Sequence, residues 1–270
     1  MQKKFVYQQL TIHYRVEGKG QPMVLIHGFG EDGHIWDEQV AFLKEHCQLF
    51  IPDLPGSGLS PVNDVSDTLQ QQLSTIPFYA ECIHALLKEE NIQRCTMIGH
   101  SMGGYITLAF TEKYPQAVAG FGFVHSTAFA DSEEKKATRQ RGIELMGQYD
   151  GYSFLKNTIP NQFGEAFKKE HPGKIDTLIE AARQFDTPAL QNYYRAMMAR
   201  TDKTSVLRGS KVPVLFIMGT EDLAAPIKDV LQQVYLPQYS YIHVLERAGH
   251  MGMWEAPGKV NQYLLEYINR

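Results

Sequence analysis

Short apolar runs and amphipathic segments alternate along most of the chain, a pattern typical of a parallel sheet covered by helices. A short continuous apolar run predicts a strand buried on both faces at 22–28, and further strands are predicted at 47–53, 95–99, 120–126, 211–219 and 240–246. Helical spacing of apolar residues falls between them, at 36–47, 77–91, 102–114, 226–236 and 257–270. Near the start, "FVYQQLTIHYRV" alternates apolar and polar residues and predicts a hairpin at the sheet edge.

The alternation stops from about Ser126 to Leu207, where no buried strand is indicated and the pattern is helical. An insertion of roughly 80 residues is too long for a plain connection between two strands. We therefore expect an α/β core domain formed by residues 1–125 and 208–270, with residues 126–207 inserted as a helical cap.

Composition and charge exclude several classes of protein. The chain has 270 residues and a formal net charge of −4, without the basic excess of a nucleic-acid-binding surface. No apolar run approaches the ~20 residues of a membrane span, and the first residues lack the apolar core of a signal peptide. The three cysteines imply no disulfide framework. We expect a soluble cytoplasmic protein, a monomer or weak homo-oligomer, that acts on a small molecule.

One serine stands between closely spaced glycines in "MIGHSMGGY". Ser101 follows a predicted strand and opens a predicted helix, with Gly99 and Gly103 two residues away on either side. This is the context of a nucleophile elbow, in which a strained turn exposes the serine hydroxyl and side chains at the glycine positions would collide with neighbouring elements. The helix start would also direct the Met102 N–H at an oxyanion. A simple glycine-rich turn is the alternative.

A serine nucleophile needs a general base, which is itself oriented by a carboxylate. Two later strand ends supply both groups in the order that an elbow requires, Asp222 in "MGTED" and His250 in "ERAGH". Glu221 adjoins Asp222 and competes for the role of the acid. His100 precedes the serine, and we expect it to pack or hydrogen-bond below the turn.

A second oxyanion donor is expected from the loop after an earlier strand. In "LIHGFGEDG" the chain bends sharply, and the Phe29 N–H would face the same oxyanion as Met102. We expect His27 only to tie down its own loop. No HExxH motif and no Cys/His ligand cluster is present, so no metal and no cofactor is expected.

Together these segments resemble the α/β-hydrolase superfamily over nearly the whole chain. The motifs in the order of the family are "HGFG", "DLPGSGLS", "GHSMGG", "GTED" and "AGH". The resemblance implies an eight-stranded, mostly parallel sheet with helices on both faces and a helical cap inserted after the sixth strand. It also implies a triad of Ser101, Asp222 and His250, with Phe29 and Met102 in the oxyanion hole. Related dehalogenases and epoxide hydrolases carry aspartate, and dienelactone-hydrolase-like members cysteine, where this chain has serine.

The leading functional hypothesis is a serine hydrolase of the carboxylesterase type, which cleaves a small apolar acyl ester through an acyl-enzyme. The same triad also serves carbon–carbon bond hydrolases, thioesterases and lyases, and elbow motifs cannot separate them. A hydrolase-like ligand receptor and a purely structural role are the non-enzymatic alternatives. Candidate pocket residues are Trp36, Phe129, Phe163, Met197 and Met198. The alternative for those in the cap is that they form its own apolar core.

Overall fold

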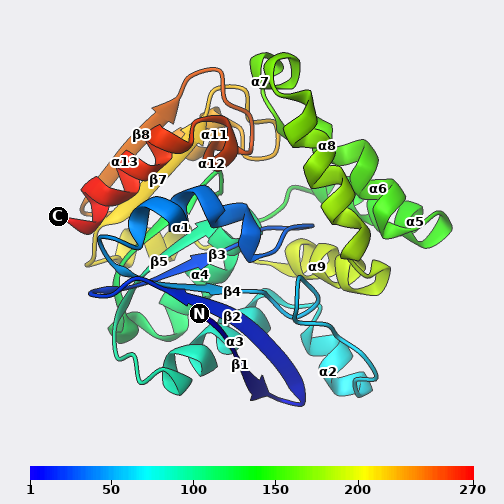
Figure 1. Cartoon of the computed structure of the whole chain (residues 1–270), viewed down its shortest axis with the longest axis horizontal. Coiled ribbons are helices and arrows are strands. Elements are labelled where there is room, and N and C mark those ends of the chain that lie inside the picture. Colours follow the sequence, from blue (N-terminus) through cyan, green and yellow to red (C-terminus); the bar gives the residue numbers. More distant parts are fainter.

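The computed structural model describes residues 1–270 and contains one eight-stranded sheet in the order β1-β2-β4-β3-β5-β6-β7-β8. The expected eight-stranded α/β architecture is therefore confirmed (Figure 1). The strands are β1 (Gln2–Tyr7), β2 (Leu10–Glu17), β3 (Pro22–Ile26), β4 (Gln48–Pro52), β5 (Cys95–His100), β6 (Val118–Val124), β7 (Val214–Gly219) and β8 (Ser240–Leu245).

Only the first part of the sheet is antiparallel. Strand β2 pairs antiparallel with both β1 and β4, and every other neighbouring pair is parallel. Every residue of β5 and β7 is buried, because helices cover both faces of the sheet, as their continuous apolar runs predict. Since parallel strands run the same way, the loops that follow β3, β5, β6, β7 and β8 gather at one edge.

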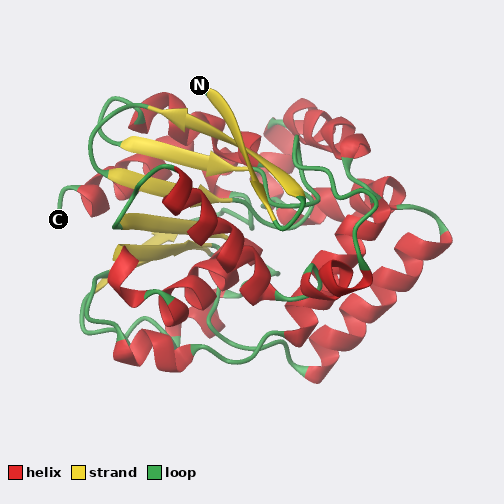
Figure 2. Ribbon diagram, turned by 90° about the horizontal axis from the view of Figure 1, so that it is seen from below, coloured by secondary structure: helices red, strands yellow, loops and turns green.

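Helices pack against the sheet on both sides (Figures 1 and 2). Helix α1 contacts α13, whereas α3 and α4 contact each other. Their bounds are α1 (Asp37–Leu43), α3 (Ile76–Glu89), α4 (Met102–Lys113), α12 (Gly252–Glu255) and α13 (Pro257–Ile268), with the short α2 (Asp67–Gln72) and α11 (Ile227–Leu231) in connecting segments. A single cluster of 70 buried apolar residues connects the sheet with its helices.

Between β6 and β7 the chain forms helices and no strand. These are α5 (Glu133–Gln148), α6 (Gly151–Thr158), α7 (Glu165–Glu170), α8 (Pro172–Ala181), α9 (Thr187–Ala199) and α10 (Thr204–Gly209), with two 3-10 turns, η3 (Ile159–Gln162) and η4 (Ala182–Gln184). Figure 1 shows α5–α9 to one side of the sheet. The boundary expected after residue 207 falls inside α10, which contacts α4. None of the helices has the length and apolar character needed to cross a membrane.

Candidate active site

Ser101 occupies a strained turn between β5 and α4. Its backbone has φ 50° and ψ −115°, a conformation that non-glycine residues rarely adopt. The flanking glycines permit close approach: a Cβ on Gly99 would lie 2.2 Å from the Gly103 carbonyl oxygen, and a Cβ on Gly103 would lie 2.3 Å from the Ile26 carbonyl oxygen. The turn therefore depends on the absence of side chains at both positions.

The loop after β3 lies beside this serine. A Cβ on Gly28 would be 3.1 Å from the Cβ of Ser101, so a side chain at position 28 would crowd the serine. Phe29 follows in the loop, and Met102 begins α4, where the first N–H groups of a helix have no intrahelical partner. Neither the Phe29 nor the Met102 amide donates a hydrogen bond to the rest of the chain. Both N–H groups are thus free to bind an anionic oxygen.

Asp222 and His250 form a hydrogen-bonded pair at the ends of β7 and β8. Nδ1 of His250 lies 3.0 Å from Oδ1 and 2.9 Å from Oδ2 of Asp222. The neighbouring Glu221 points elsewhere, since its Oε2 accepts a hydrogen bond from the backbone N–H of Glu165 at 2.8 Å. Of the two adjacent carboxylates, only that of Asp222 contacts the histidine.

The charges of this pair stabilise each other. Burial by itself would raise the pKa of Asp222, but the charge of His250 and hydrogen bonds from His125 and His250 outweigh it and lower the pKa far below its usual value. Burial would lower the pKa of His250, and the charge and hydrogen bond of Asp222 reverse that effect and raise it. Asp222 is therefore an anion at neutral pH, and His250 is a stronger base than an isolated imidazole.

His100 connects the serine turn to the His250 loop. Its Nε2 lies 3.0 Å from the carbonyl oxygen of His250, and its Nδ1 lies 2.9 Å from Oε2 of Glu31. The ring centroids of His100 and His250 are 4.8 Å apart, and Ser101 directly follows His100 in the chain. The Ser101 hydroxyl and Nε2 of His250 make no hydrogen bond within the chain. Both atoms therefore lack a hydrogen-bond partner in the chain.

Three carboxylate and imidazole groups of the site do not stand out in the sequence. Glu31 accepts from the Gly28 N–H at 2.7 Å and is almost completely buried. His125, at the end of β6, bonds Asp222. Glu255 accepts hydrogen bonds from the N–H groups of Gly249, Met251 and Gly164. A polar residue directly after an apolar strand is the only signal in the sequence that points to His125, and Glu31 and Glu255 carry none.

The His250 loop is also attached to the helical segment between β6 and β7. The His250 N–H donates to the carbonyl oxygen of Gln162 at 2.6 Å, and Glu255 reaches Gly164. On the opposite side, the ring of Phe29 stacks on that of Tyr194 in α9, with centroids 4.3 Å apart. The helices from β6 to β7 thus contact both the His250 loop and the loop after β3.

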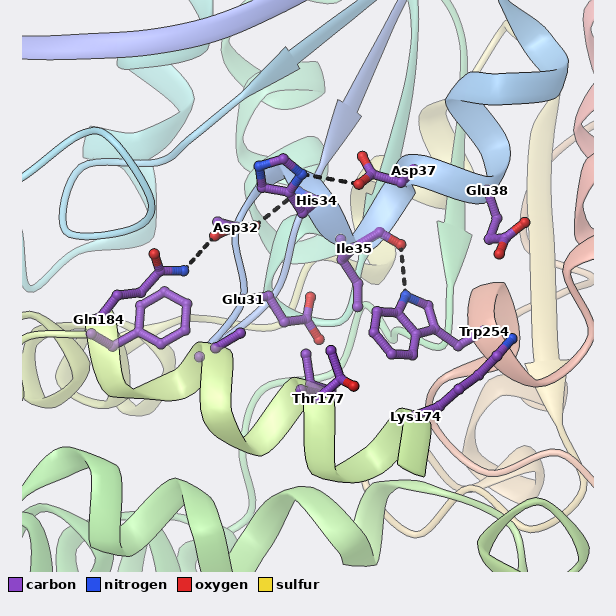
Figure 3. A pocket seen from close by; sticks show the side chains of 14 residues that line it. Glu31, Asp32, His34, Ile35, Asp37, Glu38, Lys174, Thr177, Gln184 and Trp254 are labelled. Atoms are coloured by element: carbon purple, nitrogen blue, oxygen red, sulfur yellow. Dashed lines mark hydrogen bonds and ion pairs between the residues drawn. The ribbon is translucent and has the colours of Figure 1, made fainter. Parts of the chain in front are cut away.

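A cavity of about 520 Å³ lies between the loop after β3 and helix α8 (Figure 3). Glu31 points into it, and Lys174 and Thr177 face it from α8. At its margins, the Gln184 amide nitrogen donates to Asp32 at 2.7 Å, and the Trp254 indole N–H donates to the Ile35 carbonyl oxygen at 3.2 Å. The cavity therefore separates the sheet part of the molecule from α8.

None of the five candidate pocket residues lines this cavity. Trp36 is a correction: it has no exposed surface and packs edge-on against His100, so it belongs to the core below the site and forms no pocket wall. Phe163 stacks on Phe167, and Met197 is buried in the apolar cluster. Phe129 and Met198 are partly buried. A substrate-pocket role for these last four residues stays a prediction.

The only three side chains placed to share a metal ion are His125, Asp222 and His250, whose potential ligand atoms lie within 4.8 Å of one another. Their positions are explained by hydrogen bonds alone, because each histidine presents Nδ1 to the carboxylate and His125 uses Nε2 to accept the Gly252 N–H. The nitrogen and oxygen atoms through which these three side chains face one another are therefore all hydrogen-bonded within the cluster.

A family model described as the alpha/beta hydrolase family matches residues 23–263. The chain belongs to the alpha/beta hydrolase family. It is 25% identical to (E)-2-((N-methylformamido)methylene)succinate hydrolase from Acinetobacter baylyi, over 96% of this chain and 94% of the relative. It is 24% identical to 2-hydroxy-6-oxononadienedioate/2-hydroxy-6-oxononatrienedioate hydrolase from Paraburkholderia phymatum, over 97% and 92% of the two chains.

A solved structure of a thermophilic esterase from Thermogutta terrifontis is similar to this alpha/beta hydrolase with a TM-score of 0.88. The two sequences are 26% identical, and the likeness covers 96% of this chain and 93% of the esterase chain. The matching family and the names of these relatives support hydrolase activity for this chain. The names of the relatives give different substrates, so the comparisons support hydrolase activity and leave the substrate open.

Proposed function

We propose that this alpha/beta hydrolase is a serine hydrolase with Ser101 as nucleophile, His250 as general base and Asp222 as the orienting acid. The observation that carries the proposal is the Asp222–His250 pair, in which the His250 carbonyl oxygen lies 3.0 Å from Nε2 of His100, the residue directly before a serine in a strained turn. Strained turns persist where the surrounding structure enforces them, and they cluster at catalytic groups. The amides of Phe29 and Met102 form the oxyanion hole.

The reaction proceeds in two steps on these residues. His250 takes the proton of the Ser101 hydroxyl while the oxygen attacks a carbonyl carbon, and the two amides bind the negative oxygen that develops. The protonated imidazole then gives the proton to the leaving alcohol, which leaves an acyl-enzyme. A water molecule, activated by His250 in the same way, releases the acid and restores the serine.

We propose a small carboxylic ester with an apolar acyl group as substrate, and residues 126–207 as a cap that forms part of its pocket. Similarity to a thermophilic esterase supports the ester, and the contact of Tyr194 with Phe29 supports a cap that reaches the reacting atoms. The second candidate is carbon–carbon bond hydrolysis, because a relative with 24% identity over 97% of this chain is a 2-hydroxy-6-oxononadienedioate hydrolase.

Labelling with a fluorophosphonate tests the nucleophile without knowledge of the substrate. We expect one adduct per chain, located at Ser101 by peptide mass spectrometry, and no adduct in Ser101→Ala. The matched control is Ser126→Ala, which removes a nearby hydroxyl that donates to the Ser101 carbonyl oxygen. An adduct that persists in Ser101→Ala contradicts the proposal.

A substrate panel then separates the two candidate reactions. p-Nitrophenyl esters of increasing acyl length, matching thioesters and a vinylogous diketone are compared by kcat/KM. Each buried methylene contributes up to ~0.8 kcal/mol until the pocket is full, so ester turnover should rise from acetate, peak at short to medium length and then fall. Faster cleavage of the diketone than of every ester assigns the chain to carbon–carbon bond hydrolysis.

A further inference from the structure

A second histidine contacts the acid of the proposed triad. His125 directly follows β6, and its Nδ1 lies 3.0 Å from Oδ2 of Asp222. Its side chain is completely enclosed, and its backbone has φ 55°, in the left-handed region that few residue types tolerate. Two histidines therefore compete for one carboxylate oxygen, and only one of them is needed as the base.

The proton on His125 can be placed from its other nitrogen. Nε2 lies 3.1 Å from the backbone nitrogen of Gly252, and that N–H can only donate, so Nε2 must accept. In a neutral imidazole the proton is then on Nδ1, where it is donated to Asp222. Burial is the largest effect on His125 and lowers its pKa, so the ring is neutral. His125 is a hydrogen-bond donor to Asp222 and carries no charge of its own.

Both oxygens of the Asp222 carboxylate consequently accept hydrogen bonds. Oδ1 accepts from the backbone N–H groups of Ala224 and Ala225, both at 2.8 Å, and Oδ2 accepts from His125 as well as His250. A carboxylate that accepts donors on both oxygens cannot rotate without breaking hydrogen bonds. Each donor also withdraws part of the negative charge that His250 experiences.

We propose that His125 is a positioning residue for the triad, which fixes the plane of the Asp222 carboxylate and moderates its charge, and thereby sets the basicity of His250. This inference rests on the proposed function, because it assumes that His250 acts as the base. The His125 side chain makes its hydrogen bonds to Asp222 and Gly252 and none to Ser101.

Two substitutions test the roles of the two ring nitrogens of His125 separately. In His125→Asn the side-chain amide takes the place of Nδ1, keeps a donor to Asp222 and tolerates the left-handed backbone. In His125→Gln the longer side chain places its amide near Nε2, so it can accept from Gly252 and leaves Asp222 without that donor. The matched control is His243→Gln on β8, where a half-buried histidine stacks on Tyr263 away from the site.

The experiment measures the rate of fluorophosphonate labelling of Ser101 between pH 4 and pH 10 in the full chain. The acid limb of that profile reports the pKa of His250. The other titratable groups that face the cluster are His100 from β5, Glu31 from the loop after β3, Lys135 from α5 and Glu255 from α12. They are identical in every variant, so a shift in the profile belongs to His125.

We expect His125→Gln to move the acid limb upward by about 0.5–1 pH unit. Without the hydrogen bond from His125, the Asp222 carboxylate attracts protonated His250 more strongly and raises its pKa. Its maximal labelling rate should fall roughly 10-fold or more, because Asp222 and therefore His250 are less accurately positioned. His125→Asn and the His243→Gln control should keep the wild-type acid limb.

An unchanged acid limb in His125→Gln, or an equal shift in His125→Asn, overturns the inference while the proposed function stands. Absence of Ser101 labelling in the wild-type chain overturns the proposed function itself. A measurement on the wild-type chain does not depend on the folding of any variant: ¹H–¹⁵N spectra of the histidine rings should show His125 protonated at Nδ1 near pH 7. Protonation at Nε2 overturns the inference.

Discussion

At the scale of single residues, the two adjacent carboxylates Glu221 and Asp222 differ in what they contact. Asp222 bonds His250, whereas Glu221 accepts the backbone N–H of Glu165. We expect Asp222→Asn to fold normally and to lower kcat by roughly 10²–10⁴-fold, because the amide can donate a hydrogen to Nδ1 and stabilise the wrong tautomer of His250. Glu221→Gln is the control and should retain near-wild-type kcat on the same ester. The reverse order of the two variants would assign the acid to Glu221.

At the scale of elements, one carboxylate in α12 connects the His250 loop to the helical segment between β6 and β7. Glu255 accepts the N–H groups of Gly249 and Met251 from the loop and of Gly164 from the residue that precedes α7. We expect Glu255→Ala to speed hydrogen exchange of these three amides by about fivefold, since each hydrogen bond contributes about 1 kcal/mol. Mass spectrometry of the peptides around 164 and 249–251 measures the change. In the control, Glu266→Ala on α13, whose carboxylate accepts only from Gln262, exchange there should not change.

At the scale of the whole molecule, a buried pair links pH to stability. Burial would raise the pKa of Glu31, but the charge and hydrogen bond of His100 and the Gly28 N–H lower it below its unfolded value. Its stabilisation is therefore complete above the unfolded pKa of about 4.3 and is lost as the pH falls through the folded pKa. We expect Glu31→Gln to reduce the free energy of unfolding at pH 7 by about 3 kcal/mol, because His100 loses its buried partner.

Urea unfolding at pH 7 and below pH 4 measures this dependence, and the difference between wild type and Glu31→Gln should shrink at low pH. The control is Glu180→Gln, which removes an exposed carboxylate paired with Arg183 and should change little. A difference that stays constant with pH would attribute the loss to packing around residue 31 and not to its charge.

The sequence by itself determined the alternation of elements and the chemistry at the strand ends. Continuous apolar runs predicted β3, β5 and β7 because strands buried on both faces need apolar side chains at every position. The glycines around Ser101 indicated the strained turn, since only they permit the backbone contacts that the structure shows. Signals of this kind come from residues that are neighbours in the sequence.

Tertiary structure alone decided which distant groups meet. His125 and Asp222 are 97 residues apart in the chain, and His100 and Glu31 are 69 apart, so no local pattern marks either pair. The same holds for Trp36, whose apolar ring is equally suited to a pocket wall or to the core, and which the packing of His100 against it assigned to the core. Contacts between remote segments depend on how the sheet and its helices pack, and this is why the sequence indicated the residues of the proposed triad but not the groups that contact them.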